Sequence, residues 1–422
     1  MAITLIMLFV LIPASTINVS AASIGTDPAS VIAETGEAPG GTPFTVKKDL
    51  GYVDNAHFQQ MLDVFIPDGP VPEGGWPVIV NIPGGGYNTC SKDLFDYTSQ
   101  PFFRHRNPYQ LGALDNDFAM IVVAYRTPVD VTGREPNGGM DSSIPSAERP
   151  YLMADDVMDA LRYITANAAA LGINADQLLI IADSAGGGIA SYITYDQDYV
   201  GFSIKAMAGY APAISNFAPG GDLTRLASKA GPDSPPYLLT TGSHDSVCPP
   251  ETRGLDFTNI LLSKGVHATL DILPDASHMN VDRPDNYYAR SMDLGRGNDV
   301  WDWFKLVLAG NLPAPAPTSY RLTYDASTKG AVDVVGEPIL ALEPLVAENY
   351  DYSVSAEAVK LKGNQNELTI SVTATYYNGS TSVITEKFLI DNNAVGTYKV
   401  GAHKVFVDTK GNTQIRDCRL VW

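Results

Sequence analysis

The sequence predicts an α/β fold, with a mostly parallel sheet flanked by helices, followed by a small all-β, sandwich-like domain. Strand-like and helix-like segments alternate from about residue 47 to residue 310, and such alternation builds parallel strands joined by right-handed helical crossovers. The Pro/Ala-rich stretch "NLPAPAPTS" (311–319) then ends the pattern. Beyond it, apolar and polar residues alternate in short segments separated by turn residues, as in antiparallel strands.

The first strands and the first long helix are visible in the hydrophobic pattern. Residues 61–67 alternate as a half-buried strand does, whereas 76–83 and 118–126 are nearly continuous apolar runs typical of strands covered on both faces. A helix follows over 148–172, ending at Gly172. Its core-facing positions at helical spacing are Met153, Val157, Leu161 and Ile164.

The remaining elements continue the alternation. Strands are expected at 177–182, 204–211, 236–242 and 267–274, with helices directly after Ser184, near 251–264 and at 299–310. We therefore expect one α/β domain over residues 23–310. Alternating Pro and Ala favours an extended spacer, so 311–319 is interpreted as a linker.

Residues 320–422 are expected to form the sandwich-like domain. Residues 367–377 alternate cleanly, Asn378-Gly379 is a hairpin turn signal, and 381–390 is the returning strand. Its tyrosines are either stacking residues for a polysaccharide or ordinary strand aromatics; they are Tyr350, Tyr352, Tyr376, Tyr377 and Tyr398.

The N-terminus reads as a secretory signal peptide over residues 1–22. The apolar run 3–13 is too short to span a bilayer comfortably, and Val19-Ser20-Ala21 fits a signal-peptidase site. The sequence therefore predicts a secreted, extracellular protein with no membrane span in the mature chain. A retained anchor is the alternative, because the run is preceded by no Lys or Arg.

Charge and cysteine content exclude some classes of protein. The formal net charge is −19, from acidic residues scattered along the chain, and such a surface repels phosphate backbones, so no nucleic-acid partner is expected. Three cysteines do not make a disulfide scaffold. Cys90 and Cys248 fall in two loops expected to flank one pocket, so they either form a disulfide or are unpaired small residues.

Ser184 is the first candidate catalytic residue. It lies in "ADSAG" (182–186), which matches the G-x-S-x-G nucleophile elbow except that Ala182 replaces the first glycine. The elbow needs small residues because the serine occupies a strained strand-to-helix turn. About a hundred residues upstream, "NIPGGGYN" (81–88) follows an apolar strand. A glycine-rich loop there can direct several backbone N–H groups at a developing oxyanion.

Asp245 and His278 complete the pattern. Asp245 follows the strand at 236–242 and His278 follows the strand at 267–274. Open α/β sheets build their sites at the carboxyl ends of their strands, and the chain order Ser…Asp…His is that of α/β-hydrolases. No other histidine or aspartate occupies a matching loop. No cluster of His, Cys and carboxylate residues has metal-ligand spacing, so neither a metal nor a cofactor is expected.

Residues of about 47–310 thus resemble an α/β-hydrolase of the carboxylesterase/hormone-sensitive-lipase type. The family's "GDSAGG" reads "ADSAGG" here, and its "HGGG" loop reads "PGGG", with Pro83 in place of histidine. The family's Tyr-Arg pair appears as Tyr125-Arg126, interpreted as structural. The resemblance implies oxyanion-hole amides at Gly85, Gly86 and Ala185. Tyr87, directly after these glycines, is a separate candidate for substrate binding.

The function expected from these residues is that of a secreted serine carboxylesterase. Ser184 attacks a small-molecule or polymer-borne ester to form an acyl-enzyme, His278 is the base, and Asp245 orients its ring. The alternatives are a lipase or serine peptidase on the same fold, or a non-catalytic carbohydrate-binding or adhesion protein.

Overall fold

The structure is a computed structural model of the 422-residue chain. The residues that it describes in the α/β part are 25–92, 106–131, 134–135, 137–217, 222–242, 245, 247–273, 276, 278 and 299–312. Beyond them it describes strand residues at 322–325, 331–334, 351–360, 365–375, 381–391, 396–400, 403–407 and 413–415. The predicted signal peptide and nearly all of the predicted linker lie outside the described residues.

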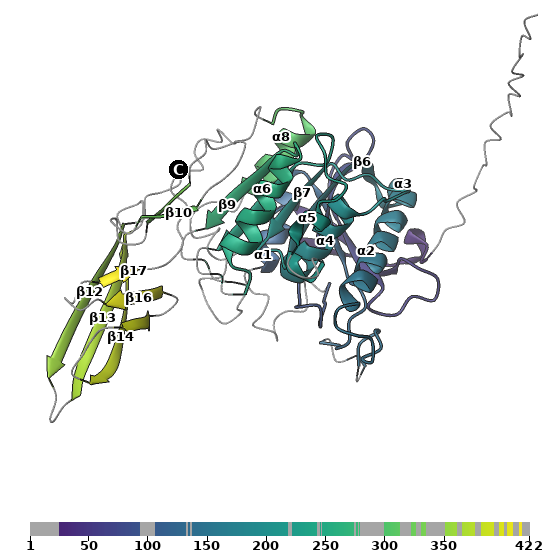
Figure 1. Cartoon of the computed structure of the whole chain (residues 1–422). Coiled ribbons are helices and arrows are strands. Elements are labelled where there is room, and N and C mark those ends of the chain that lie inside the picture. Colours follow the sequence, from purple (N-terminus) through teal and green to yellow (C-terminus); the bar gives the residue numbers. More distant parts are fainter. Residues whose placement is uncertain are drawn as a thin grey trace, which may run out of the picture.

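A nine-stranded sheet forms the centre of the α/β part, in the order β1-β2-β3-β5-β4-β6-β7-β8-β9 (Figure 1). Its strands are β1 (Ala33–Glu37), β2 (Pro43–Gly51), β3 (Met61–Pro67), β4 (Trp76–Ile82), β5 (Ala119–Val123), β6 (Ile173–Asp183), β7 (Ala206–Tyr210), β8 (Tyr237–Gly242) and β9 (Ala268–Leu273). The strands from β5 to β9 pair in parallel, whereas β1, β2 and β3 pair antiparallel at one side. The mostly parallel sheet that the sequence predicts is therefore present.

Helices cover both faces of this sheet (Figure 1). They are α1 (Arg106–Leu111), α2 (Arg149–Ala166), α3 (Ala168–Leu171), α4 (Ser184–Asp196), α5 (Leu223–Leu226), α6 (Asp256–Ser263) and α8 (Asp299–Leu308). Short helical turns lie at η1 (Pro28–Ser30), η3 (Leu114–Asn116), η4 (Ile214–Phe217) and the π-helical η6 (Pro250–Leu255). The predicted helix over 148–172 is divided at Asn167 into α2 and α3, and Gly172 ends it in the left-handed conformation.

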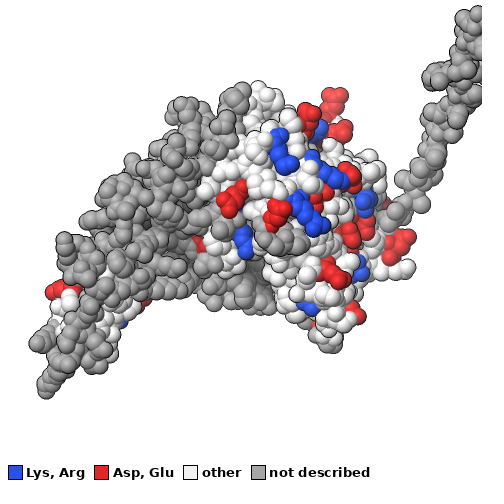
Figure 2. Space-filling model, viewed as in Figure 1, with Lys and Arg blue, Asp and Glu red and all other residues white. Residues whose placement is uncertain are grey.

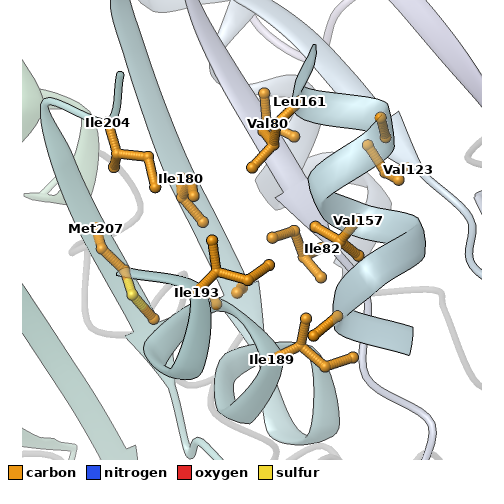
Figure 3. Close-up of a cluster of buried hydrophobic side chains, with 14 of the residues drawn as sticks. Val80, Ile82, Val123, Val157, Leu161, Ile180, Ile189, Ile193, Ile204 and Met207 are labelled. Carbon is orange, nitrogen blue, oxygen red and sulfur yellow. The ribbon is translucent and has the colours of Figure 1, made fainter. Parts of the chain in front are cut away.

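Two apolar clusters hold these layers together, one on each face of the sheet. Side chains of α2, α4 and α6 pack on the first face, and Figure 3 shows Val157 and Leu161 of α2 meeting Val80 and Ile82 of β4. On the second face, Tyr109 of α1 and the buried Trp301 and Trp303 of α8 pack against the sheet. Burial on both faces explains why the central strands are nearly continuous apolar runs.

The antiparallel strands β1 and β2 are absent from the sequence-based prediction. β1 carries the sequence AETGE and has no buried residue, so it lacks the hydrophobic alternation that marks a strand. In β2 the register with β3 shifts between Lys47 and Leu50. Such a bulge interrupts the two-residue period on which recognition of a strand depends.

The C-terminal part contains antiparallel strands in three small sheets, β10-β11, β12-β13-β14 and β15-β16-β17. Their bounds are β10 (Leu322–Asp325), β11 (Ala331–Val334), β12 (Asp351–Lys360), β13 (Gln365–Thr375), β14 (Thr381–Asp391), β15 (Gly396–Val400), β16 (His403–Val407) and β17 (Thr413–Ile415). β13 and β14 pair as the predicted hairpin, with Thr375 opposite Thr381, while Asn378 and Gly379 lie outside the described residues.

A small apolar cluster joins two of these sheets. It contains Leu368 and Ile370 of β13 together with Val407 of β16, and Phe388 and Tyr398 pack against it. The Phe388 and Tyr398 rings have centroids 4.9 Å apart. Tyr398 thus packs within the C-terminal strands, and a role of these tyrosines in polysaccharide binding stays a prediction. In the part of the chain that the structure describes, no helix is both long and apolar enough to cross a membrane.

Candidate active site

Ser184 lies at the turn from β6 into α4, where the backbone is strained. Its φ is +47°, in the left-handed region that residues with a Cβ rarely adopt, whereas Asp183 before it is extended. The helix comes so close to β4 that a Cβ built on Gly186 would lie 2.1 Å from the carbonyl oxygen of Ile82. The glycine is required for this approach.

Ala182 fits the turn despite replacing the usual glycine. It is fully buried near the end of β6, opposite Ile82 on one side and Gly209 on the other. Gly209 has no side chain, and the space beside it is filled by the Tyr237 ring, since a Cβ there would lie 2.3 Å from the Tyr237 hydroxyl. The Ala182 methyl group is itself part of the apolar cluster on the first face of the sheet.

His278 and Asp245 lie together with Ser184, although β8 and β9 separate them in the chain. Ser184 Oγ is 3.0 Å from His278 Nε2, and His278 Nδ1 is 2.7 Å from Asp245 Oδ2. The side chains of His278 and Asp245 are 13% and 0% exposed. With the ring proton on Nδ1, the histidine donates to the carboxylate and leaves Nε2 to accept the proton of the serine hydroxyl.

The second oxygen of Asp245 is also engaged. Asp245 Oδ1 accepts hydrogen bonds from the backbone N–H groups of Val247 and Cys248, at 2.9 and 2.7 Å. The carboxylate thus bridges its own loop and the histidine ring, which fixes the ring's orientation.

Two glycines of the loop after β4 have positive φ angles. Gly85 has a φ of +146° and Gly86 a φ of +64°. A Cβ on Gly85 would lie 1.9 Å from the Thr89 carbonyl oxygen, so this position requires glycine. Within the described part of the chain, the N–H groups of Gly85 and Gly86 donate no backbone hydrogen bond. The N–H of Ala185, in the first turn of α4, has no carbonyl four residues earlier inside the helix.

Two side chains hold the start of this loop. The N–H of Gly84 donates to Asp183 Oδ2 at 2.9 Å, so the residue before Ser184 anchors the loop to the turn that carries Ser184. The hydroxyl of Tyr125 donates to the carbonyl of Pro83 at 2.5 Å. These contacts give Asp183 a positioning role that sequence reasoning missed, and they identify the partner of Tyr125, which the sequence analysis interprets as structural. No local pattern shows which carbonyl or amide a side chain reaches.

Arg126, the second member of the Tyr-Arg pair, has the structural role assigned to it. Its guanidinium lies 2.7 Å from Asp156 Oδ1, and its N–H groups also reach Oδ2. Since Asp156 belongs to α2, this pair attaches the end of β5 to the helix.

Tyr87, the candidate for substrate binding, makes a hydrogen bond within the protein. The residue is buried with a φ of +58°, and its hydroxyl donates to the carbonyl of Ala213 at 2.7 Å. The N–H of Ala213 in turn donates to the carbonyl of Ser184 at 2.7 Å. Tyr87 therefore connects the glycine loop to the segment after β7, and substrate contact by this residue stays a prediction.

The disulfide between Cys90 and Cys248 is not formed in the structure. The two residues belong to different apolar clusters, Cys90 to that on the first face of the sheet and Cys248 to that on the second. Loops that flank one site can thus bury their cysteines on opposite sides of a sheet. Burial raises the pKa of the Cys248 thiol to about 12, with the Asp245 carboxylate as the next cause.

Part of the chain that carries this geometry matches a known protein family. Residues 62–216 match the model of the family BD-FAE, an α/β-hydrolase esterase family. The matched segment runs from β3 to η4 and includes the glycine loop and the Ser184 turn, while Asp245 and His278 lie beyond it. A search among curated proteins gave no match.

Several solved esterases have a similar chain path. A truncated carbohydrate esterase from gut microbiota is 16% identical, with 63% of this chain and 96% of that chain covered and a TM-score of 0.46. Esterase 2 of Thermogutta terrifontis, phosphoramylated by tabun, is 20% identical, with 66% and 98% covered and a TM-score of 0.45. Esterase B of Lactobacillus rhamnosis is 19% identical, with 63% and 88% covered and a TM-score of 0.43.

These identities and TM-scores are too low to transfer a residue role or a substrate to this chain. The family match and the sheet order are independent of them. Residues 62–216 match the BD-FAE family of α/β-hydrolase esterases, and the mostly parallel sheet around them has the α/β architecture that the sequence motifs predict.

Proposed function

We propose that the protein is a serine carboxylesterase that works through Ser184, His278 and Asp245 and forms an acyl-enzyme. The observation that carries the proposal is the continuous chain of hydrogen bonds from Ser184 Oγ through the His278 ring to Asp245. A nucleophile, a base within hydrogen-bond reach and a group that orients the base are the parts that acyl transfer needs.

In the proposed reaction, His278 Nε2 takes the proton of the Ser184 hydroxyl as its oxygen attacks the ester carbonyl. The imidazolium that forms is stabilised by the Asp245 carboxylate, 2.7 Å from Nδ1. The same proton then passes to the departing alcohol, leaving the acyl group on Ser184. Water repeats the sequence with His278 again as base, which releases the acid and restores the serine.

The amides of Gly85, Gly86 and Ala185 are proposed to bind the oxyanion of each tetrahedral intermediate. The left-handed backbone at Gly85 and Gly86 and the first-turn position of Ala185 support this role. Because the glycine loop is anchored through Asp183 and Tyr125, its donors are held in place before charge develops, which is the condition for effective electrostatic stabilisation.

Hydrolysis of 4-nitrophenyl esters from acetate to palmitate by wild type and by Ser184→Ala tests the proposal. Wild type should hydrolyse the short esters, and Ser184→Ala should lose at least about 10³-fold in kcat because the nucleophile is gone. Absence of activity in wild type would favour the non-catalytic alternative. A preference for palmitate would favour a lipase, and cleavage of peptides in place of esters would favour a peptidase.

Secretion is proposed from the sequence alone. The apolar run at 3–13 and the small residues at 19–21 are those of a signal peptide. Expression of the full chain in a secreting host, followed by determination of the mature N-terminus, tests this proposal. Cleavage near residues 21–22 supports it, whereas a membrane-bound chain that keeps its first residues supports the anchor.

A further inference from the structure

Arg253 is a charged residue beside the site that the proposed mechanism does not use. It lies in η6, eight residues after Asp245, and its side chain is partly buried. The backbone N–H of Arg253 donates to the carbonyl of Pro249 at 3.0 Å. The turn that carries the guanidinium is thus closed onto the loop that carries the catalytic acid.

The guanidinium is held by a hydroxyl group of the segment after β7. Arg253 Nη1 donates a hydrogen bond to Ser215 Oγ in η4. Ser215 lies two residues after Ala213, whose N–H donates to the carbonyl of Ser184 and whose carbonyl accepts from the Tyr87 hydroxyl. One short segment therefore contacts the nucleophile, the glycine loop and this guanidinium.

The charge of Arg253 acts on both neighbouring loops. Burial raises the pKa of the Tyr87 hydroxyl and of the Cys248 thiol, and in both cases the positive charge of Arg253 opposes the rise. Tyr87 follows the glycine loop, and the N–H of Cys248 donates to Asp245. The guanidinium is thus within electrostatic range of residues on the two sides of the site.

No carboxylate pairs with Arg253 among the described residues, although acidic side chains outnumber basic ones 47 to 28 in this chain. Three other arginines of the α/β part do have such partners: Arg126 pairs with Asp156, Arg162 with Asp159 and Arg134 with Asp49. A partly buried guanidinium without a counter-charge is unfavourable on its own and attracts an anion.

We propose that Arg253 is a specificity-determining residue that binds a carboxylate of the ester substrate. The inference rests on the proposed esterase function and deepens it. Ser215 accepts one guanidinium N–H and so holds the group in place, while further N–H donors of the planar fork face the two oxygens of the bound carboxylate. The preferred substrates are therefore esters that carry a negative charge on either their acid or their alcohol part.

Two pairs of esters, each matched in shape, test this inference. In the first pair the charge is on the acyl side, with mono-4-nitrophenyl adipate compared with its neutral methyl ester. In the second it is on the alcohol side, with 4-acetoxybenzoate compared with methyl 4-acetoxybenzoate. The quantity measured is the ratio of kcat/KM for the charged ester to kcat/KM for its neutral partner.

Arg253→Met should lower this ratio by about tenfold or more in one of the two pairs, because a charge-assisted hydrogen bond to the substrate is lost. Arg253→Lys should keep part of the preference, since the charge remains without the planar fork. The matched control is Arg162→Met, which removes the same charge from an ion pair on the exposed face of α2 and should leave the ratio unchanged.

A measurement on wild type covers the case in which Arg253→Met does not fold. Raising ionic strength should lower kcat/KM for the charged ester of the sensitive pair and not for its neutral partner. The inference is overturned if Arg253→Met leaves the ratio of kcat/KM for charged and neutral ester unchanged in both pairs, or if salt does not change this ratio in wild type. In that case, Ser184-dependent hydrolysis of the neutral esters would still support the esterase proposal. If the neutral esters are not hydrolysed at all, the esterase proposal fails and this inference fails with it.

Discussion

At the scale of single residues, the site depends on backbone conformations that few side chains permit. Ser184 has a φ of +47° and Gly85 a φ of +146°, and both are held by tightly packed surroundings. The sequence shows these positions through its small residues, because strained turns select glycine and alanine around them. What the sequence does not show is the set of partners that hold the strained backbone.

Gly85→Ala should disable the glycine loop. Its Cβ would lie 1.9 Å from the Thr89 carbonyl oxygen, so the loop must move and the amides beside it lose their direction. We expect kcat for 4-nitrophenyl acetate to fall by about 10²-fold, the scale of a lost oxyanion donor. Gly41→Ala is the matched control, since Gly41 also has a positive φ but has open space around it; equal losses of kcat in both variants would contradict this assignment.

Tyr87→Phe separates a positioning role from a substrate contact. Removal of the hydroxyl leaves the Ala213 carbonyl without this donor, which should lower the free energy of unfolding by about 1 kcal/mol and reduce kcat several-fold. Denaturant unfolding and steady-state kinetics measure both. An increase in KM alone, with stability unchanged, would instead indicate that the hydroxyl contacts the substrate.

Cys248 should make stability fall at alkaline pH. The folded thiol has a pKa raised by burial to about 12 from an ordinary 9.0. As pH rises, the unfolded thiol therefore loses its proton before the folded thiol does. The contribution of Cys248 to the free energy of unfolding is complete below pH 9 and is lost as pH rises toward 12. Between these values the slope should approach about 1.4 kcal/mol per pH unit.

Denaturant unfolding of wild type and of Cys248→Ser between these pH values measures whether the free energy of unfolding falls as pH rises. The serine variant should show the shallower decline, and identical slopes would contradict the account.

Thiol titration of unfolded, unreduced protein should find both Cys90 and Cys248 reactive, whereas a missing pair of thiols would indicate a disulfide that the structure does not contain.

At the scale of elements, the segment that follows β4 is fixed on both sides of its glycines. Asp183 and Tyr125 hold it before them. After them, Lys92 Nζ lies 2.7 Å from Asp63 Oδ1 on β3 and 2.7 Å from Asp49 Oδ1. The Lys92 and Asp63 side chains are 5% and 3% exposed. Burial raises the pKa of Asp63 and the Lys92 charge opposes that rise.

Lys92→Met should therefore be strongly destabilising. It leaves the buried Asp63 carboxylate without its cation, and breaking such a pair costs about 3–5 kcal/mol of the free energy of unfolding. The control is again Arg162→Met, whose partner Asp159 is exposed and for which we expect less than about 1 kcal/mol. Equal changes in urea midpoint for the two variants would show that the buried pair does not anchor the loop.

At the scale of the whole molecule, the sequence predicts the layers of the α/β part and the strand ends that carry Ser184, Asp245 and His278. Parallel strands covered on both faces leave a clear hydrophobic signal, and chain order then determines which loops meet. The hydrophobic pattern and the chain order do not predict features that depend on which strands pair or on which face of the sheet a loop packs. The edge strand β1 is exposed, and the separation of Cys90 from Cys248 depends on which face each loop turns toward.

The C-terminal strands should be dispensable for hydrolysis of small esters. Among the described residues, the apolar clusters that hold the nine-stranded sheet contain none beyond 312, and the strands from β12 to β16 have a small cluster of their own. We expect a chain ending at residue 312 to keep the kcat/KM of the full chain for 4-nitrophenyl acetate. A loss beyond about tenfold, accompanied by a lower melting temperature, would contradict the proposed boundary.

The central claim, that Ser184 is the nucleophile, is tested most directly by covalent labelling. Incubation with diisopropyl fluorophosphate, followed by intact-mass and peptide mass spectrometry, identifies the residue that carries the adduct. The account predicts one phosphoryl group per chain on the peptide containing Ser184, a parallel loss of esterase activity, and no adduct on Ser184→Ala. An adduct on another residue, or full esterase activity in labelled protein or in Ser184→Ala, would contradict it.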